Sequence, residues 1–281
     1  MSQFLDTRKQ LAILKEQPEE FGGLLFYPVT MEHYSLFRDC ELALTLRQST
    51  LPATYAVKNF AQALYALDID ALLKTGEATG IWSRFVIAIC LALRIPIQNV
   101  GKFVRQITDP ERPNELKAII VTQHTEDSER VVRLTPQQLT QVRTIIARQN
   151  GSQLPDESEN PELVQAEQDI ADYQKSKLIP SIETMVAAVA ANQHVRLSDV
   201  YSWTIYEFEQ TKSAIERDRG YLVYNAGEMS GMVKFKNGNP YPSIFFDKKR
   251  ESSAVVSVDS LKSRLGDAVQ TVDALPDLQS H

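Results

Sequence analysis

One stretch constrains the fold of this chain more than any other: GSQLPDESENPE, residues 151–162. It is polar and acidic, it contains two prolines, and it has no apolar periodicity that a core could bury. We therefore expect a mobile acidic linker at this place. The linker would divide the 281 residues into an N-terminal α+β domain, 1–150, and a C-terminal helical domain, 163–281, which ends in a polar tail.

The N-terminal part opens with an extended segment and continues with helices. Gly22–Thr30 is rich in apolar and aromatic residues and predicts a short strand or an extended entry segment. Thr30 is then the expected N-cap of a helix, and Pro52 is expected to start another helix that continues through Leu67. The most apolar run is interrupted by arginine, so it predicts a buried core helix over Ile81–Leu93 and not a membrane span.

The pattern changes from helices to strands after residue 101. Three β-rich stretches, KFVRQITD, ELKAIIVTQ and ERVVRLT, are separated by two polar stretches that suit exposed turns. They predict a three-stranded antiparallel meander over residues 102–134. A helix with clear boundary signals follows, because Thr135 is a fitting N-cap, Pro136 suits the first position and Gln138 completes a capping box. Asn150 and the glycine after it are expected to end this helix.

Further helices are expected in the C-terminal part. Pro161 and Ser181 each mark the start of one. A longer helix is expected after Thr204, because Thr204 and Glu207 have the hydroxyl group and the carboxylate of a capping box, and Ser198 is another candidate N-cap. Taken together, the sequence predicts an α+β fold that is predominantly α-helical: an N-terminal helical group with a small antiparallel meander, followed by a C-terminal helical part.

No residue pattern in the chain indicates catalysis or a cofactor. The four histidines are too far apart in sequence to suggest a metal pair, and no phosphate-binding or nucleophile motif occurs. Cys40 lies between two acidic residues, which would raise its pKa, and both Cys40 and Cys90 are expected as free buried thiols. We therefore expect a protein that is not an enzyme and that needs no metal or cofactor. The net charge of -6 argues against a dedicated nucleic-acid binder.

One segment combines basic and aromatic residues, Met232–Arg250, and it is the main candidate for contact with a partner protein. The residues expected to bind the partner are Met232, Lys234, Phe235, Lys236, Tyr241, Phe245 and Phe246. Two alternatives stay open: the segment could bind single-stranded nucleic acid by stacking and phosphate contacts, or its aromatic residues could pack on the chain's own helices. The small residues just before it, in NAGEMSGM, would allow another backbone to approach closely.

Two stretches of the chain resemble one phage family. LLFYPVTMEHYSLFRDCELAL resembles the opening of tail-module proteins from long-tailed phages of Gram-positive hosts, in which an extended segment ending in a proline leads into a helix with tyrosine and phenylalanine. VRLSDVYSWTIYEFEQTKSAIERDRGYLVYNAGEMSGMVKFKNG is similar to the C-terminal half of these proteins. The resemblance covers about half of the chain and leaves out the meander and the acidic linker.

The resemblance implies a non-enzymatic tail assembly chaperone. Such a protein binds the tail tube or the tape measure protein in the host cytoplasm and keeps it soluble until the tail polymerises. Two other functions are kept as alternatives: a structural virion component of the tail or neck, and a nucleic-acid-binding accessory protein that uses Lys234–Arg250. No membrane association is expected, and self-association is left open.

Overall fold

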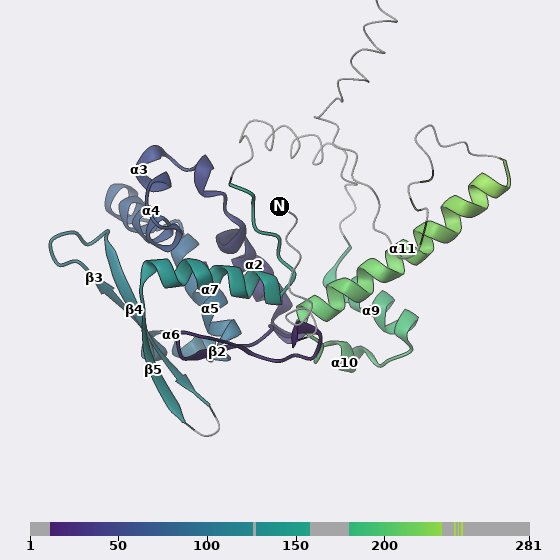
Figure 1. Ribbon diagram of the computed structural model, residues 1–281, viewed down its shortest axis with the longest axis horizontal. Helices are drawn as coiled ribbons and strands as arrows, with labels where there is room; N and C mark the ends of the chain where they lie inside the picture. Colours follow the sequence, from purple (N-terminus) through teal and green to yellow (C-terminus); the bar gives the residue numbers. More distant parts are fainter. Residues whose placement is uncertain are drawn as a thin grey trace, which may run out of the picture.

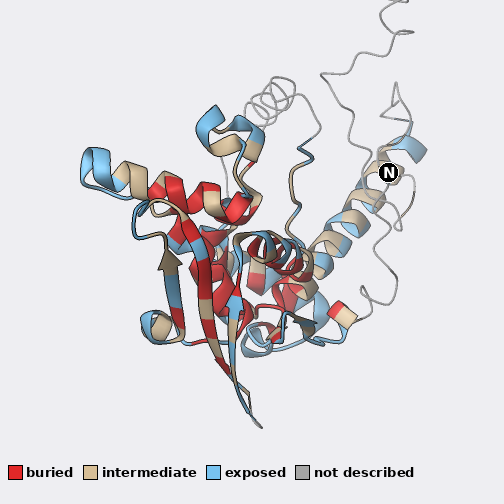
Figure 2. Cartoon of the chain, turned by 60° about the vertical axis from the view of Figure 1, so that its left-hand side comes forward, coloured by how far each residue is buried: buried red, intermediate tan, exposed pale blue. Residues whose placement is uncertain are grey.

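Figure 1 shows the computed structural model of this protein, which describes residues 12–125, 128–157 and 180–231 together with Asn239, Tyr241 and Ser243. The fold is α+β and predominantly helical, with two small antiparallel sheets, as the sequence predicts. The buried residues gather where the helices meet the larger sheet (Figure 2). None of the helices in these ranges is long and apolar enough to cross a membrane.

A β-hairpin lies near the start of the described chain. β1 (Glu19–Phe21) pairs antiparallel with β2 (Leu24–Phe26) through a turn of two glycines, whose φ angles of 61° and 84° lie in the left-handed region. Leu24 and Phe26 of β2 are 0% exposed, so β2 is the inner strand of the pair. The strand expected within Gly22–Thr30 is confirmed, whereas β1 was not predicted.

A helical group follows the hairpin: η1 (Met31–His33), α2 (Tyr34–Thr45), η2 (Gln48–Thr50), α3 (Ala53–Ala56), α4 (Phe60–Thr75) and α5 (Ile81–Ala92). The helix expected after Thr30 is confirmed, but it begins with a 3-10 turn and the Thr30 side chain makes no capping hydrogen bond. The single helix expected from Pro52 is wrong. It is divided into α3 and α4, because the backbone of Asn59 is extended and places that residue at the N-cap of α4.

α5 is the buried core helix that the sequence predicts, and its N-terminus is capped from α4. The N-cap position of α5 is Gly80, which has no side chain to accept a hydrogen bond. The carboxylate of Asp68, which is 4% exposed, accepts instead from the backbone N–H groups of Ile81 at 3.3 Å and Trp82 at 3.1 Å. A negative charge at the positive end of the helix dipole is favourable, so this contact holds α4 and α5 together.

The three-stranded meander is confirmed. η3 (Ile97–Asn99) and α6 (Val100–Phe103) lead into β3 (Val104–Thr108), β4 (Leu116–His124) and β5 (Glu129–Leu134), which pair antiparallel in that order. The sheet starts slightly later than expected, because Lys102 and Phe103 belong to α6. Ile119, Val121 and Leu134 lie on one face of the sheet and are 0% exposed, so this face is part of the core.

α7 (Pro136–Gln149) has the boundaries that the sequence predicts. The Thr135 hydroxyl accepts from the N–H of Gln138 at 3.4 Å, and the Gln138 side chain accepts from the N–H of Thr135 at 2.9 Å, which completes the capping box. At the other end the helix stops at Asn150, and Gly151 follows with a left-handed φ of 74°.

A buried arginine joins α7 to the end of α2. Arg143 donates to the carbonyl oxygens of Leu44 at 2.5 Å and Leu46 at 2.9 Å, and its guanidinium lies 3.6 Å from the centre of the Phe60 ring. Burial lowers the pKa of Arg143 to about 10, and the nearby carboxylate of Glu157 opposes that shift. The buried cation is therefore held by carbonyl oxygens at the C-terminal end of α2, where the helix dipole is negative.

The C-terminal part contains α9 (Ile182–Gln193), α10 (Leu197–Val200) and α11 (Ile205–Met229). Ser181 and Thr204 cap α9 and α11 as predicted, since their hydroxyl groups accept backbone N–H groups at 3.3 and 3.1 Å. The expectation that Ser198 is an N-cap is wrong, because Ser198 lies inside α10 and Arg196 holds the N-cap position. The helix expected to start at Pro161 lies outside the described residues.

Residues on both sides of the expected linker contribute to one hydrophobic cluster. Val186, Val200 and Phe208 belong to the same buried cluster as Phe37 and Phe85 of the N-terminal helices. In the described part of the molecule the C-terminal helices therefore pack on the N-terminal body. The division of the chain into 1–150 and 163–281 stays a prediction.

The first residues of the expected linker are held against α2 and η2. Ser152 donates to the carboxylate of Glu41 at 2.7 Å. The carboxylate of Glu157 accepts from the N–H groups of Gln48 at 2.9 Å and Ser49 at 3.0 Å. Burial raises the pKa of Glu157, but these bonds outweigh burial and the pKa is lowered. The polar side chains that keep this stretch out of the core thus anchor it to the surface of the N-terminal helices.

The backbone from Leu24 to Met31 is largely buried and obtains hydrogen bonds from buried amide side chains. Gln123 of β4 accepts from the N–H of Leu25 at 2.9 Å and donates to its carbonyl at 2.7 Å. Asn150 accepts from the N–H of Val29 at 2.8 Å, and Gln149 donates to the last carbonyl of β2 at 2.8 Å. Unpaired backbone groups would be costly there, so these amides make the buried path acceptable.

The same segment also pairs with the start of α11. The N–H of Ile205 donates to the carbonyl of Val29 at 2.8 Å, and the N–H of Met31 donates to the carbonyl of Trp203 at 2.8 Å. Thr30 and Thr204 form an antiparallel bridge between these bonds. The larger sheet, α7 and the start of α11 are therefore all hydrogen-bonded to the backbone of this one segment.

We predict that Gln123→Ala lowers the free energy of unfolding by about 3 kcal/mol, because it leaves the backbone groups of Leu25 without partners and creates a small void. Urea unfolding followed by circular dichroism measures the change. The matched control is Gln137→Ala, at an exposed position of α7, which should change the stability by less than about 0.5 kcal/mol. Equal effects of the two substitutions would contradict the role given to Gln123.

Candidate protein-contact site

The residues predicted to contact a partner fall mostly outside the described part of the chain. Met232, Lys234, Phe235, Lys236, Phe245 and Phe246 all lie outside the described residues. Tyr241 is described, and it lies against α11. Its N–H donates to the side chain of Asn239 at 2.8 Å, and Asn239 in turn donates to Glu228 at 3.2 Å.

Tyr241 packs on a glycine that the sequence reasoning did not single out. A Cβ atom added at Gly220 would lie 2.9 Å from the ring of Tyr241, which is closer than real Cβ contacts allow. The rings of Tyr241 and Tyr224 have their centres 5.2 Å apart. Gly220 is thus the small residue that permits the ring of Tyr241 to approach the backbone of α11 closely. Gly231, expected in that role, has open space at its Cβ position and a left-handed φ of 70° just after α11 ends.

The distal part of α11 leaves an apolar surface exposed. We call Leu222, Val223, Ala226 and Met229 the α11 apolar surface, and Leu222, Val223 and Met229 are 53%, 69% and 89% exposed. Leu222, Ala226 and Met229 have the i, i+4, i+7 spacing of one helix face. At 3.6 residues per turn, that face lies on roughly the opposite side of the helix from Gly220, where Tyr241 packs.

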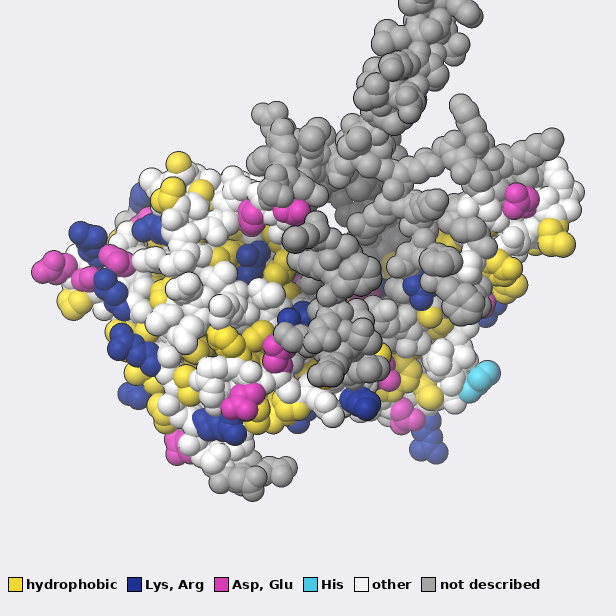
Figure 3. Space-filling view, in the orientation of Figure 1, with side chains coloured by type: hydrophobic (Ala, Val, Ile, Leu, Met, Phe, Trp, Pro, Cys, Tyr) yellow, Lys and Arg dark blue, Asp and Glu magenta, His cyan; other side chains and the backbone are white. Residues whose placement is uncertain are grey.

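The figures show how this surface is presented. α11 starts in the body and extends away from it, and the residues toward its far end are intermediate or exposed (Figures 1 and 2). Hydrophobic side chains are visible along the far end of α11 on the right of the space-filling view (Figure 3). Arg219 of α11 donates to Asn192 of α9 at 3.1 Å. Beyond it, no described residue of α11 is buried.

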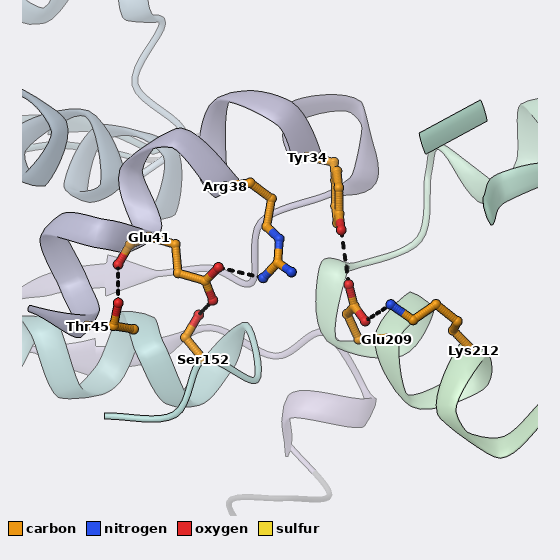
Figure 4. A network of polar contacts seen from close by, with 7 residues as sticks. All are labelled: Tyr34, Arg38, Glu41, Thr45, Ser152, Glu209 and Lys212. Atoms are coloured by element: carbon orange, nitrogen blue, oxygen red, sulfur yellow. Dashed lines mark hydrogen bonds and ion pairs between the residues drawn. The ribbon is translucent and has the colours of Figure 1, made fainter. Parts of the chain in front are cut away.

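The base of α11 is fixed to α2 by a polar network (Figure 4). The hydroxyl of Tyr34 donates to the carboxylate of Glu209 at 3.1 Å, and Lys212 forms an ion pair with the same carboxylate at 2.5 Å. The ring of Tyr34 also meets Phe208 edge to face, with ring centres 6.1 Å apart. Burial, followed by the negative charge of Glu209, raises the pKa of Tyr34, so its hydroxyl stays a donor well above neutral pH.

The same network extends along α2 to the stretch after α7. Arg38 pairs with Glu41 at 2.5 Å, and its guanidinium lies 5.5 Å from the centre of the Tyr34 ring. Glu41 also accepts from Ser152, as described above, and its backbone carbonyl accepts from Thr45 at 2.9 Å. These contacts give α2 a polar side, while Tyr34, Phe37, Cys40, Ala43 and Leu44 form its buried side.

The described histidine, cysteine and acidic side chains were the candidates for a metal site and for thiol chemistry. No group of three or more histidine, cysteine or acidic side chains in the described ranges could hold a metal ion. Cys40 and Cys90 are free and buried, as expected. Burial raises the pKa of Cys40 to about 11, with a further contribution from Asp39, and burial raises that of Cys90 to about 12. Both thiols are protonated and inert at neutral pH.

Comparison with known proteins finds no protein-family model, no curated protein and no solved structure that matches this chain. The fold is therefore described by its own elements alone. The geometry that bears on function is a helix fixed at its base, with an apolar surface at its far end and an aromatic residue of the predicted contact segment on the opposite side.

We predict that Tyr34→Phe lowers the free energy of unfolding by about 1 kcal/mol, because a partly buried hydrogen bond to a carboxylate is lost. In a double-mutant cycle with Glu209→Gln, measured by urea unfolding, the two changes should couple by about the same amount. Tyr221→Phe, on the same helix as Glu209, is the control and should show no coupling. Additive effects of Tyr34→Phe and Glu209→Gln would contradict the proposed anchor.

We further predict that neither cysteine reacts in the native protein. At pH 8, labelling of Cys40 and Cys90 with iodoacetamide should be at least about a hundredfold slower than in the same chain unfolded in urea, since both burial and the raised pKa suppress the thiolate. Intact-mass spectrometry over time measures the two rates. Rapid labelling of either cysteine in the native chain would show that its thiol is accessible and ionised.

Proposed function

We propose that this chain is a tail assembly chaperone of a long-tailed phage, which binds tail tube or tape measure protein in the host cytoplasm without catalysing a reaction. The observation that carries the proposal is the α11 apolar surface, exposed on a helix whose base is fixed to the body. The resemblance of the two stretches to tail-module proteins supports the same function. One of these stretches contains all of α11.

An exposed apolar helix face suits the task of a chaperone for assembling subunits. Apolar side chains at i, i+4 and i+7 are the usual anchors by which a helix docks on the apolar surface of another protein. Contact through a few exposed apolar residues buries little area, so it is reversible and can be given up when the subunits polymerise. The net charge of -6 keeps the free protein soluble while that face is uncovered.

The contact is proposed to continue into the basic and aromatic segment after α11. Tyr241, which belongs to this segment, packs at Gly220, on the side of α11 away from Leu222, Ala226 and Met229. The partner would then contact the far end of the helix together with Phe235, Phe245 and Phe246, as the sequence analysis expects. We leave self-association of the chain open.

We predict that the double substitution Leu222→Ser and Val223→Ser abolishes the chaperone effect and leaves the fold intact. Both residues are exposed, so the free energy of unfolding should change by no more than about 1 kcal/mol. The measurement is the soluble fraction of the tail tube and tape measure proteins from the same genome, each co-expressed with the wild-type or variant chain. The wild type should raise the soluble fraction of one of them, and the variant should not.

A matched control is available on the other side of the molecule. Leu73 of α4 and Val57, the C-cap of α3, are 69% and 84% exposed, and Figure 1 shows α3 and α4 on the opposite side of the molecule from the far end of α11. Leu73→Ser combined with Val57→Ser removes the same chemical groups and should keep the effect. If both double variants act like the wild type, the α11 apolar surface is not the contact.

The protein content of purified virions distinguishes a chaperone from a structural component of the tail or neck. A chaperone should be absent from mature virions, because it leaves when the tail polymerises. Mass spectrometry of purified particles that finds the chain in stoichiometric amount would assign it to the tail or neck instead.

A further inference from the structure

β3 is an edge strand that lacks a partner on its outer side in the described part of the chain. The three strands are ordered β3, β4 and β5, and β3 pairs only with β4 there (Figure 1). An edge strand presents alternate N–H and C=O groups to its open side, which another extended segment can pair with.

The hydrogen bond of Val104 indicates which groups are open. The N–H of Val104 donates to the carbonyl of Val100, the first residue of α6, so it is not given to β4. Backbone groups of a strand alternate between its two sides, and Gln106 is two residues further along the strand. The N–H and C=O of Gln106 therefore point to the open edge, whereas those of Arg105 and Ile107 point to β4.

An apolar pocket lies beside this open edge. It has a volume of about 310 Å³ and is lined by Trp82, Ser83, Val86, Ile87, Ile97, Val100 and Gln106, which come from α5, η3, α6 and β3. The volume is large enough for one aliphatic or aromatic side chain. Gln106 contributes to the pocket wall, so the pocket lies on the face of the sheet to which the side chain of Gln106 belongs.

A strand added to β3 would place its side chains in a defined way. Residues opposite one another in paired strands share a face, so the residue paired with Gln106 would direct its side chain toward the pocket. Its two neighbours would project on the other face, on which Arg105 lies. Arg105 is exposed and forms no ion pair with a described residue, and Lys102, just before the strand, is also exposed. This end of the edge is therefore positively charged.

We propose that the outer edge of β3 binds an extended, acidic segment of a partner protein, with one apolar side chain of that segment in the pocket between α5 and β3. Backbone pairing with Gln106 sets the register, the pocket selects an apolar residue, and Arg105 selects acidic residues on either side of it. The surface is separate from the α11 apolar surface and does not depend on the function proposed above.

The test uses the full-length chain and a fluorescein-labelled peptide, Ser-Thr-Glu-Leu-Glu-Thr-Ser, in a fluorescence anisotropy titration. The peptide should bind saturably. A peptide with serine in place of the central leucine should bind about tenfold more weakly, because the pocket stays empty. A peptide with lysines in place of the glutamates should also bind about tenfold more weakly, and added salt should weaken only the acidic peptide. Equal binding of all three peptides would overturn the proposal.

Two substitutions at Gln106 isolate the backbone contribution. Gln106→Pro removes the open N–H and is tolerated at a strand edge, and it should weaken binding of the acidic peptide at least about tenfold. Gln106→Ala also removes the side chain but keeps the N–H, and it should bind within about threefold of the wild type. If circular dichroism shows that the proline variant is unfolded, Ser83→Trp decides the question, because it fills the pocket from an exposed position of α5.

A substitution that reverses the charge of Arg105 tests the electrostatic contribution, and Arg133 on the other edge of the sheet provides a matched control. Arg105 and Arg133 lie in one cross-strand row, each opposite Ile120 of β4, and both are exposed. Arg105→Glu should weaken binding of the acidic peptide about tenfold, while Arg133→Glu, with the same change in net charge, should leave it within about twofold. Similar losses with both variants would mean a non-specific charge effect and would overturn the proposal.

Hydrogen exchange of the Gln106 amide shows whether the edge of β3 is instead covered by another segment of the same chain or by a second copy. It should be fast in the free chain at any protein concentration and slow with the acidic peptide bound. Slow exchange in the free chain at low concentration would mean that another segment of the same chain covers the edge. Slow exchange that appears only at high concentration would mean that a second copy covers it. Either result would overturn the proposal of a partner segment.

Discussion

The fold depends on hydrogen bonds from three buried amide side chains to the extended backbone between Leu24 and Met31. A backbone that runs through a core without a sheet on both sides is unfavourable, because each unpaired N–H or C=O group costs free energy. Gln123, Gln149 and Asn150, 1%, 1% and 3% exposed, supply the missing partners from β4 and the end of α7. The sheet and α7 can therefore be held together by a segment that belongs to neither.

This central segment also determines where α11 begins. Its far end bonds to Trp203 and Ile205, so the first turn of α11 is fixed to the same backbone that the amides hold. Tyr34 then fixes the second turn through Glu209. A helix of 25 residues whose first turns are fixed in this way, and which Arg219 joins to α9 further along, presents its far end at a defined angle. Exposed apolar residues on a rigid support bind with a smaller loss of conformational entropy than the same residues on a flexible tail, which favours a contact role for α11.

The parts of the fold that could be predicted are those with local signals. The capping box at Thr135, the N-cap at Thr204 and the alternating strands of the meander each depend on residues a few positions apart. The parts that could not be predicted join residues far apart in sequence: Gln123 with Leu25, Asp68 with the start of α5, and Gly220 with Tyr241. A glutamine within a strand or a glycine within a long helix has no local property that identifies its distant partner.

For the same reason, only part of the candidate contact site could be predicted from the sequence. The small residues in NAGEMSGM, at the end of α11, suggested close backbone approach, yet Gly231 only ends the helix and the close approach occurs at Gly220. The open edge of β3 could not be predicted, because a strand sequence does not say which side will be paired. That follows from the order of the strands and from the bond between Val104 and Val100.

The two surfaces differ in what they can recognise. The α11 apolar surface offers side chains alone and tolerates varied partners, whereas β3 offers backbone groups in a fixed register beside a pocket and an arginine.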